Sequence, residues 1–283
     1  MEIIIGKNSG FCNGVKYTID KALEVLSKFH PVYCLGEIVH NKDVVSLLEE
    51  KGMITVNSIL EIPNNSKVII RAHGESLDIY DKAKGKNLDI IDLTCGKIKI
   101  IHKEVLEHND SFIIIIGKHD HPEVIGTKGH CKYAYVISNE NDIDGCYKEF
   151  FNSKRKDIYI ISQTTFNNND FDILVDKIKN KFNNTDIIVN KSICNATNLR
   201  QKEVVELSKN VDKMVIIGGK NSSNTKELYN LSKDHCETYL IENKDDISFR
   251  FNESDKIGIM AGASTSNDIV LEVIEEIKKT TLK

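Results

Sequence analysis

The 283-residue chain has no tryptophan, only three prolines, and no hydrophobic run long enough to cross a membrane. Apolar stretches such as FIIIIG at 112–117 have the length of a β-strand instead. Linkers rich in proline, glycine or serine are also missing, so we expect any domains to be packed closely. The N-terminus, MEIIIGKNSGF, lacks the charged start and long apolar core of a signal peptide. We therefore expect a cytoplasmic protein without a membrane partner.

An excess of positive charge is missing too, since the formal net charge is −4 and the pI is near 6.2. Nucleic-acid binding needs a basic surface, so we expect no nucleic-acid partner. The chain has seven cysteines but no C-x-x-C pair. An odd number of cysteines in an intracellular chain argues against a disulfide framework, and the missing C-x-x-C argues against a zinc ribbon or a thioredoxin motif. Cysteines that act together must therefore be brought together by the fold.

Apolar, β-branched runs alternate with longer amphipathic stretches along the whole chain. Strand candidates include IIIG, PVYCLG, KVIIRA, DIIDLT, FIIIIG, AYVIS, DIYIIS, IIVNKSI, KMVIIGG, TYLIE and KIGIMAG. Helices are expected, among other places, at 42–51, 166–182, 198–210, 223–233 and 266–279. Strands that alternate with helices predict an α/β fold with mainly parallel sheets.

Three kinds of loop recur in a fixed order, which indicates an internal repeat. The first kind reads GEIVHNKDV, GKHDHPEVIG and GKNSSNTKEL, and the second reads RAHGES, SQTTFN and AGASTSND. Cysteine turns complete each cycle in FCNGV, TCGKIKIIHKEV and ICNATNLRQKEV. We predict three similar α/β units in a pseudo-threefold arrangement, at 13–94, at 95–192, and at 193–283 together with the N-terminal strand 1–12.

The cysteines and polar residues of these loops all follow predicted strands, and ligands of parallel sheets bind beyond the carboxyl ends of the strands. If the three units face one another, Cys12, Cys95 and Cys194 meet at one point. Cys12 also lies at a predicted helix N-terminus, where backbone N–H groups and the helix dipole favour a thiolate. The polar residues expected around the three cysteines are His40, His73, His121, Thr164, Thr165, Ser222, Asn224 and Ser264. The other four cysteines, Cys34, Cys131, Cys146 and Cys236, are expected to be packing residues.

Three thiolates from separate loops predict a metal site, because cysteine sulfur selects zinc, Cu(I) or iron–sulfur clusters. A structural zinc usually takes four protein ligands and close C-x-x-C pairs, which are missing here. A four-iron cluster held by three cysteines leaves one iron free to act as a Lewis acid, which suits the polar ring. Histidines, hydroxyls and helix N-termini are donors for phosphate oxygens. Glu123 in HPEV is either an ordinary first-turn helix acid or, beside such an iron, a proton donor.

The motifs GFCNGV, GEIVHN, RAHGE, HPEVIGTKGH, SQTTF, SICNATNLRQKEV, GGKNSSNTKEL and AGASTS resemble, in this order, the 4-hydroxy-3-methylbut-2-enyl diphosphate reductase or LytB family. The resemblance runs from residue 3 to about residue 275. It implies three α/β domains around a central [4Fe-4S] cluster with Cys12, Cys95 and Cys194 as ligands and one open iron. It also implies an oxidoreductase of the last step of the methylerythritol phosphate route to isoprenoids, where reductive dehydroxylation yields isopentenyl and dimethylallyl diphosphates.

The resemblance also implies roles for individual residues. Glu123, with Thr164 or Thr165, would relay a proton to the departing hydroxyl, and His121 would lie close to both this group and the diphosphate. An electron donor such as ferredoxin or flavodoxin is implied as a partner. One departure is Gly96, where the family usually has a proline after its second cysteine. The residues implied to hold the diphosphate are His40, His73, His121, Thr165, Ser222, Ser223, Asn224 and Ser264.

Two other functions stay open at this point. A zinc- or iron-binding sensor of phosphorylated ligands would use the same donors without turnover, but it has no use for Glu123. An iron–sulfur dehydratase acting on a hydroxy acid needs an arginine to clamp the carboxylate. Arg71 and Arg200 are the only arginines in these motifs, which makes the dehydratase the weaker alternative.

Overall fold

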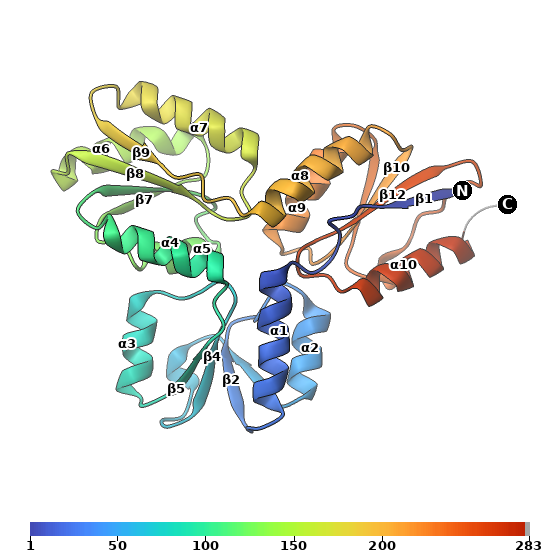
Figure 1. Ribbon diagram of the computed structural model, residues 1–283, viewed down its shortest axis with the longest axis horizontal. Helices are drawn as coiled ribbons and strands as arrows, with labels where there is room; N and C mark the ends of the chain where they lie inside the picture. The colour runs from blue at the N-terminus through green and yellow to red at the C-terminus, as the bar shows by residue number, and fades with distance from the viewer. Residues whose placement is uncertain (281–283) are drawn as a thin grey trace. The chain divides into compact units, whose positions relative to one another are not determined.

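The computed structural model describes residues 1–280, and it contains three parallel sheets of four strands each (Figure 1). Sheet A consists, in spatial order, of β1 (Glu2–Ile5), β12 (Lys256–Ala261), β10 (Lys213–Ile217) and β11 (Glu237–Ile241). Sheet B consists of β3 (Met53–Val56), β2 (Val32–Leu35), β4 (Lys67–Ile70) and β5 (Asp89–Asp92). Sheet C consists of β7 (Ala134–Ile137), β6 (Phe112–Ile116), β8 (Asp157–Ser162) and β9 (Asp186–Val189). The predicted α/β class with parallel sheets is confirmed.

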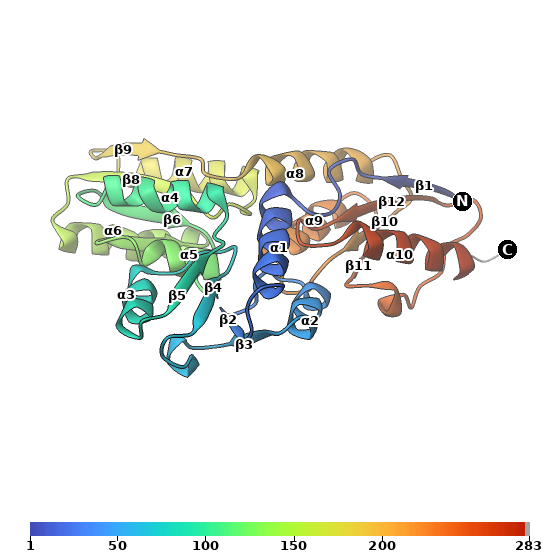
Figure 2. The ribbon, with the colours of Figure 1, turned by 60° about the horizontal axis from the view of Figure 1, so that its bottom comes forward.

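The three sheets share one strand order. β10, β2 and β6 occupy equivalent places in sheets A, B and C. With the sheets compared in this way, β1 of sheet A corresponds to β5 of sheet B and to β9 of sheet C. The first strand of the chain therefore completes the last sheet, as the repeat predicted. β1 pairs in parallel with β12, with Ile3 opposite Ile257, and Figure 2 shows the two strands side by side. Each sheet takes its strands from one of the three predicted ranges, while the boundaries themselves stay a prediction.

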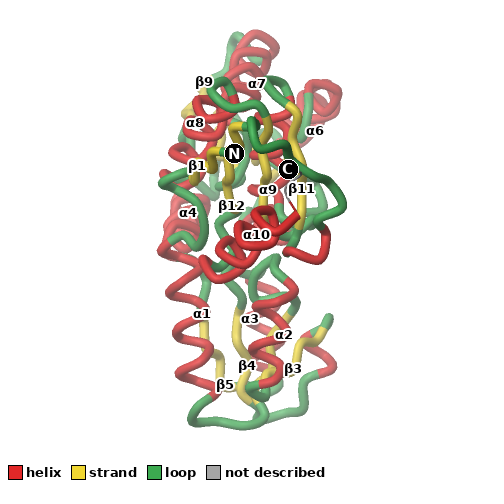
Figure 3. The backbone as a smooth tube through the Cα atoms, turned by 90° about the vertical axis from the view of Figure 1, so that its right-hand side faces the viewer, coloured by secondary structure: helices red, strands yellow, loops and turns green. Residues whose placement is uncertain are grey.

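The helices repeat in the same way. The cysteine turns are followed by α1 (Asn13–Leu26), α4 (Gly96–Glu107) and α8 (Asn195–Ser208). The first loops lead into α2 (Lys42–Glu50), α5 (Pro122–Lys128) and α9 (Ser223–Lys233), and the second loops into α3 (Leu77–Gly85), α7 (Asn168–Lys181) and α10 (Asn267–Thr280). Sheet C has the further helix α6 (Ile143–Ser153), preceded by the short η2 (Glu140–Asp142); the other sheets have only η1 (Ile59–Glu61) and η3 (Lys244–Asp246) there. Figure 3 shows α1 and α2 running alongside the strands of sheet B.

The five helices predicted by range correspond to α2, α7, α8, α9 and α10, with ends shifted by at most three residues. The strand list missed β3, a four-residue edge strand of sequence MITV. Only its first and last residues, Met53 and Val56, are buried, and among the described strands it pairs with β2 alone.

Sheet C is covered on both faces. Phe150 of α6 and Phe171 of α7 pack with Ile160 on one face, whereas Ile101 of α4 and Ile161 belong to the layer on the other face. All residues of β6 are buried, as expected for a parallel strand with helices on both sides. The four cysteines predicted to be packing residues are confirmed as such in β2, in the two layers of sheet C, and beside sheet A.

The chain forms two compact units, which are described separately below. The first unit contains Met1–Lys16, Val39–Val44 and the chain from Asn195 onward, and with these sheet A. The second unit contains Tyr17–Ile38 and Val45–Cys194, and with these sheets B and C. None of the helices within residues 1–280 is both long enough and apolar enough to cross a membrane.

The burial of residues in sheet C predicts how substitutions there change the free energy of unfolding. Ile160 is fully buried in β8, whereas the side chain of Ile188 in the neighbouring β9 is 53% exposed. Ile160→Ala should lower the free energy of unfolding by about 2–5 kcal/mol, because the methyl groups leave a cavity that the packed helices cannot fill. Ile188→Ala should change it by less than about 0.5 kcal/mol. Urea unfolding followed by circular dichroism measures both values, and equal effects of the two changes would contradict this account of the core.

Candidate functional site

The three predicted ligand cysteines occupy the same place in their sheets. Cys12, Cys95 and Cys194 each follow the edge strand that completes a sheet, and a helix begins at the next residue. Each cysteine N–H donates to a carbonyl oxygen two residues beyond the end of the adjacent strand. The acceptors are Ala263 for Cys12 at 3.1 Å, Ala72 for Cys95 at 3.0 Å, and Thr164 for Cys194 at 3.0 Å. This shared hydrogen bond fixes each cysteine beside the second loop of its own sheet.

Cys12 shows how such a turn is built. The Val15 N–H in the first turn of α1 points at the Cys12 Sγ atom, 3.4 Å away, which confirms the predicted position at a helix N-terminus. Gly10 has φ +86°, a conformation that L side chains rarely adopt, and its carbonyl accepts a hydrogen bond from the buried Arg200 guanidinium. In the second turn, Gly96 is the first residue of α4, and an added Cβ there would meet no heavy atom within 4 Å. A larger residue would therefore fit at position 96 without a steric clash.

In the first unit, the loop of His40 is held by the loop of Ser264. The Ser264 hydroxyl donates to the His40 carbonyl at 3.2 Å. Asn41 donates from Nδ2 to the Ser264 carbonyl at 2.8 Å, and its Oδ1 accepts from the Val44 N–H in the first turn of α2. Gly219 makes the close approach feasible, because a Cβ there would lie 2.5 Å from the His40 oxygen. The structure thus brings His40 and Ser264 together through backbone atoms.

The turn of Ser222, Ser223 and Asn224 forms the start of α9 in the same unit. Ser222 is the N-cap, and its hydroxyl accepts a hydrogen bond from the Thr225 N–H at 3.3 Å. Ser223 and Asn224 are buried in the first helical turn, and Asn224 Nδ2 has no hydrogen-bond partner among residues 1–280. A buried donor at a helix N-terminus is suited to an anion, because the helix dipole and free N–H groups act in the same direction.

In the second unit, Glu123 and Thr164 form a buried pair. The carboxylate accepts two hydrogen bonds from Thr164, one from its N–H at 2.6 Å and one from its hydroxyl at 2.7 Å. The carbonyl of the same threonine accepts the hydrogen bond from Cys194 described above. Thr164 therefore connects a carboxyl group with a predicted ligand cysteine.

Burial raises the pKa of Glu123 to about 7, although its two hydrogen bonds from Thr164 act in the opposite direction. The side chain is only 3% exposed and lies in the first turn of α5. An ordinary glutamate is fully ionised near neutral pH, whereas this one is divided between its two protonation states. It can therefore both donate and accept a proton at physiological pH.

His73 and His121 lie close to this pair in the second unit. Their ring centroids are 5.6 Å apart, and the two rings are almost perpendicular. His121 is the N-cap of α5, and its Nδ1 accepts from the Glu123 N–H at 3.2 Å. A neutral ring that accepts at Nδ1 carries its proton at Nε2, where it can donate to another group.

The two threonines of SQTT have different surroundings. The sequence left open which of them accompanies Glu123, and the structure places Thr164 there. Thr165 Oγ1 instead accepts from Gln163 Nε2 at 2.8 Å, and Gln163 Oε1 accepts from the Lys118 N–H. Gln163 and Asn41 were missed by the sequence analysis, although each directly adjoins a predicted site residue. The predicted ring of all the polar residues around three cysteines stays a prediction.

The Glu123–Thr164 pair makes a prediction about ionisation. In Thr164→Val the pKa of Glu123 should rise above the wild-type value of about 7, because the hydroxyl that favours the carboxylate is lost while burial remains. Thr165→Val is the matched control and should leave this pKa unchanged, since Thr165 bonds to Gln163. A ¹³C NMR titration of glutamate carboxyl groups measures it, with Glu123→Gln to assign the signal. A wild-type pKa near the ordinary value of 4.5 would refute the burial argument.

Comparison with known proteins identifies the relatives of this chain. Residues 3–278 match the family model described as LytB protein. The 4-hydroxy-3-methylbut-2-enyl diphosphate reductase of Clostridioides difficile is 43% identical over 279 residues, which cover 97% of this chain and 98% of that protein. The enzyme of the same name from Caldanaerobacter subterraneus is 39% identical over 287 residues, covering 98% of this chain and 97% of that protein.

Solved structures agree with these relatives. The E-1-hydroxy-2-methyl-but-2-enyl-4-diphosphate reductase of Plasmodium falciparum superimposes with a TM-score of 0.89 at 29% identity, covering 99% of this chain and 91% of that one. A structure described as (E)-4-hydroxy-3-methyl-but-2-enyl diphosphate reductase, the terminal enzyme of the non-mevalonate pathway, gives a TM-score of 0.70 at 34% identity, covering 98% of this chain and 99% of that one. The matches run over nearly the whole chain in sequence and in structure, and the chain belongs to the LytB protein family.

Proposed function

We propose that the protein is an oxidoreductase that removes the hydroxyl group of 4-hydroxy-3-methylbut-2-enyl diphosphate and yields isopentenyl and dimethylallyl diphosphates. This is the last step of the methylerythritol phosphate route. The observation that carries the proposal is Thr164, which bonds to Glu123 through its side chain and to Cys194 through its carbonyl. Glu123, whose pKa is about 7, is thus linked through Thr164 to Cys194, a predicted cluster ligand. The names of the relatives supply the substrate.

Cys12, Cys95 and Cys194 fit an iron–sulfur cluster as a donor set. All three occupy equivalent turns at the start of a helix. They would hold a [4Fe-4S] cluster with three cysteine ligands and leave one iron open. When bound, such a cluster supplies electrons and a Lewis-acidic iron for the substrate hydroxyl. A zinc site would be expected to have a fourth protein ligand.

The diphosphate would be bound mainly by neutral donors. Asn224 offers an Nδ2 group without a partner among the described residues, and Ser222 and Ser223 lie at the same helix N-terminus. Neutral donors suit a closed site, because a lysine ammonium group there would first have to lose its tightly bound water. The other residues proposed to bind the diphosphate are His40, His73, His121, Thr165 and Ser264.

Glu123 would supply the proton that turns the departing hydroxyl into water. In the overall reaction the C–O bond breaks, two electrons and two protons enter, and water and the allylic or isomeric diphosphate leave. The Thr164 hydroxyl touches the Glu123 carboxyl and would pass the proton on, while His121 orients the start of α5. Because Glu123 is buried, few water molecules can reach its carboxyl group.

The electrons would come from a carrier protein such as ferredoxin or flavodoxin in the cytoplasm, as in the family that the sequence resembles. A hydroxy-acid dehydratase is disfavoured by the arginines. Arg71 pairs with Glu75 at 2.9 Å, and Arg200 donates to the carbonyl groups of Gly10 and Ala196. Both guanidinium groups therefore already bond to the protein, which argues against a role as a carboxylate clamp.

Oxidation of reduced viologen tests the proposed reaction. Protein purified without oxygen should oxidise the dye rapidly when 4-hydroxy-3-methylbut-2-enyl diphosphate is added. Cys194→Ser should abolish this activity and remove most of the bound iron and sulfide, whereas Cys131→Ser, at a packing cysteine, should retain both. Failure of an iron-replete wild-type protein to react would overturn the substrate assignment, and an active, iron-free Cys194→Ser variant would overturn the cluster.

Glu123→Gln distinguishes the reductase from a phosphate-ligand sensor. In the reductase kcat should fall about 100-fold or more, because a general acid contributes factors of this size, while KM stays within about threefold. The wild-type kcat should also decline as the pH rises through about 7, since the protonated form of Glu123 is the active acid. Steady-state kinetics with the viologen assay measures both effects. Unchanged turnover in Glu123→Gln would exclude the proton relay.

A further inference from the structure

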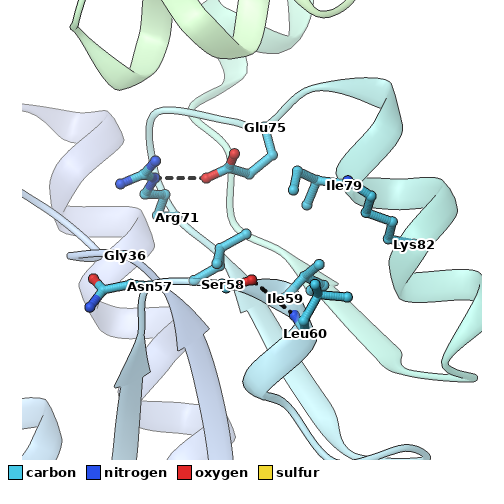
Figure 4. Close-up of a pocket in the computed structure, with 10 residues that line it drawn as sticks. Gly36, Asn57, Ser58, Ile59, Leu60, Arg71, Glu75, Ile79 and Lys82 are labelled. Carbon is cyan, nitrogen blue, oxygen red and sulfur yellow. Dashed lines mark hydrogen bonds and ion pairs between the residues drawn. The ribbon is translucent and has the colours of Figure 1, made fainter.

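The loop of residues 71–76 carries His73 and is closed by an ion pair, and we call it the His73 loop. Arg71 Nε donates to Glu75 Oε1 at 2.9 Å, and the two side chains are only 17% and 9% exposed. The pair lines a cavity of about 270 Å³. Figure 4 shows the two side chains of the pair, with Ser58 and Leu60 below them. Gly36, at φ +68°, leaves the space that the guanidinium occupies. The side chains of Leu35, Ile59 and Ile79 also line this cavity, which leaves open space beside the ion pair.

His130 supports the His73 loop from another side. Its Nε2 lies 2.9 Å from the Glu75 carbonyl oxygen, which can only accept. The proton of His130 is therefore on Nε2. The ring is 7% exposed, so the Glu75 carbonyl would lose its partner in a dry environment if the imidazole were removed. His130 belongs to HPEVIGTKGH, but the proposed reaction gives it no role.

His102 of α4 holds the His130 ring in place. The two rings are stacked with centroids 4.0 Å apart and an angle of 25° between their planes. Burial lowers the pKa of both groups, that of His102 to about 3, so both rings are neutral at physiological pH and can stack without repulsion. The backbone of Gly74, at φ +72°, lies against His102, because a Cβ there would be 2.7 Å from the ring carbon Cε1.

The helix of Glu123 packs directly on the same loop. Gly126 of α5 and Gly129, the C-cap of α5, both face this loop. A Cβ at Gly126 would lie 3.3 Å from the Gly74 oxygen, and one at Gly129 would lie 2.1 Å from the Ser76 Cβ atom. His121 is the N-cap of α5, and its ring centroid lies 5.6 Å from the ring centroid of His73. The contact between α5 and the His73 loop therefore determines the spacing of the two histidines.

We propose that His130 is a positioning residue, which holds the His73 loop against α5 through the Glu75 carbonyl and thereby sets His73 at its distance from His121. The inference rests on the proposed function in one respect, the assignment of His73 and His121 to the diphosphate. His130 itself touches no substrate. Its removal should let the loop move towards the cavity and weaken substrate binding more than it slows the chemical step.

The first test compares three variants of the cluster-containing protein. His130→Ala should raise KM about tenfold and change kcat less than about threefold, because the loss of one buried hydrogen bond is of this size. His130→Gln should restore KM to within about threefold, since its amide N–H can donate to the same carbonyl. His235→Ala, at an exposed histidine of the first unit, serves as the control. A merely structural histidine would not show this split between KM and kcat or this rescue by glutamine.

Hydrogen exchange measures the loop without relying on turnover. In His130→Ala the amides of residues 72–76 should exchange about tenfold faster, while those of sheet C stay unchanged and His130→Gln resembles the wild type. If the wild-type protein fails to react with the diphosphate but His130→Ala still shows faster exchange of the loop than the wild type, the proposed function fails and the positioning role of His130 stands. Unchanged exchange of the loop in His130→Ala would overturn the role of His130, whatever the activity.

A second variant keeps the test independent of the histidine. Gly126→Ala places a methyl group 3.3 Å from the Gly74 oxygen and should push the His73 loop away, with the same rise in KM and the same faster exchange while His130 is intact. Gly85→Ala is the matched control, because an added Cβ there meets no heavy atom within 4 Å. If Gly126→Ala leaves both KM and loop exchange at the wild-type values, the packing of α5 does not position His73.

Discussion

The constraint on which the structure depends is the parallel direction of all strands within each sheet. Parallel strands place all their carboxyl ends, and the loops that follow, at one edge of the sheet. Cys12, Cys95 and Cys194 each lie in the turn that follows an edge strand, and each cysteine donates its N–H to the loop of the adjacent strand. The same backbone hydrogen bond therefore recurs at all three cysteine turns.

Glycines let these polar loops approach one another more closely than side chains would allow. Gly126 and Gly129 bring α5 against the backbone of the His73 loop, and Gly219 meets the carbonyl of His40. Water is excluded where backbones pack this closely, so polar groups keep only the partners that the protein provides. The same exclusion of water raises the pKa of Glu123 and lowers that of His102. The shifted pKa values of Glu123 and His102 therefore follow from the burial of these side chains.

Much of the fold could be predicted because its repeat is visible in the sequence. The cycle of three loop types predicted that the N-terminal strand belongs to the last sheet, and β1 pairs with β12 accordingly. β3, whose four residues pair with β2, was absent from the strands predicted from the sequence. Thr164 and Thr165 could not be told apart in the sequence, because adjacent residues of one type differ only in the direction of their side chains. The structure gives them different partners, Glu123 and Gln163.

The sequence by itself determined the class of fold, the order of the loops, and the kinds of donor that they carry, since these follow from local patterns of apolar and polar residues. Only the tertiary structure decided which donors are neighbours and how far each is buried. Glu123 and Thr164 are 41 residues apart, and Glu75 and His130 are 55 residues apart, yet each pair is in hydrogen-bond contact. Desolvation and hydrogen bonding depend on distances in space, and these are set when helices and sheets pack.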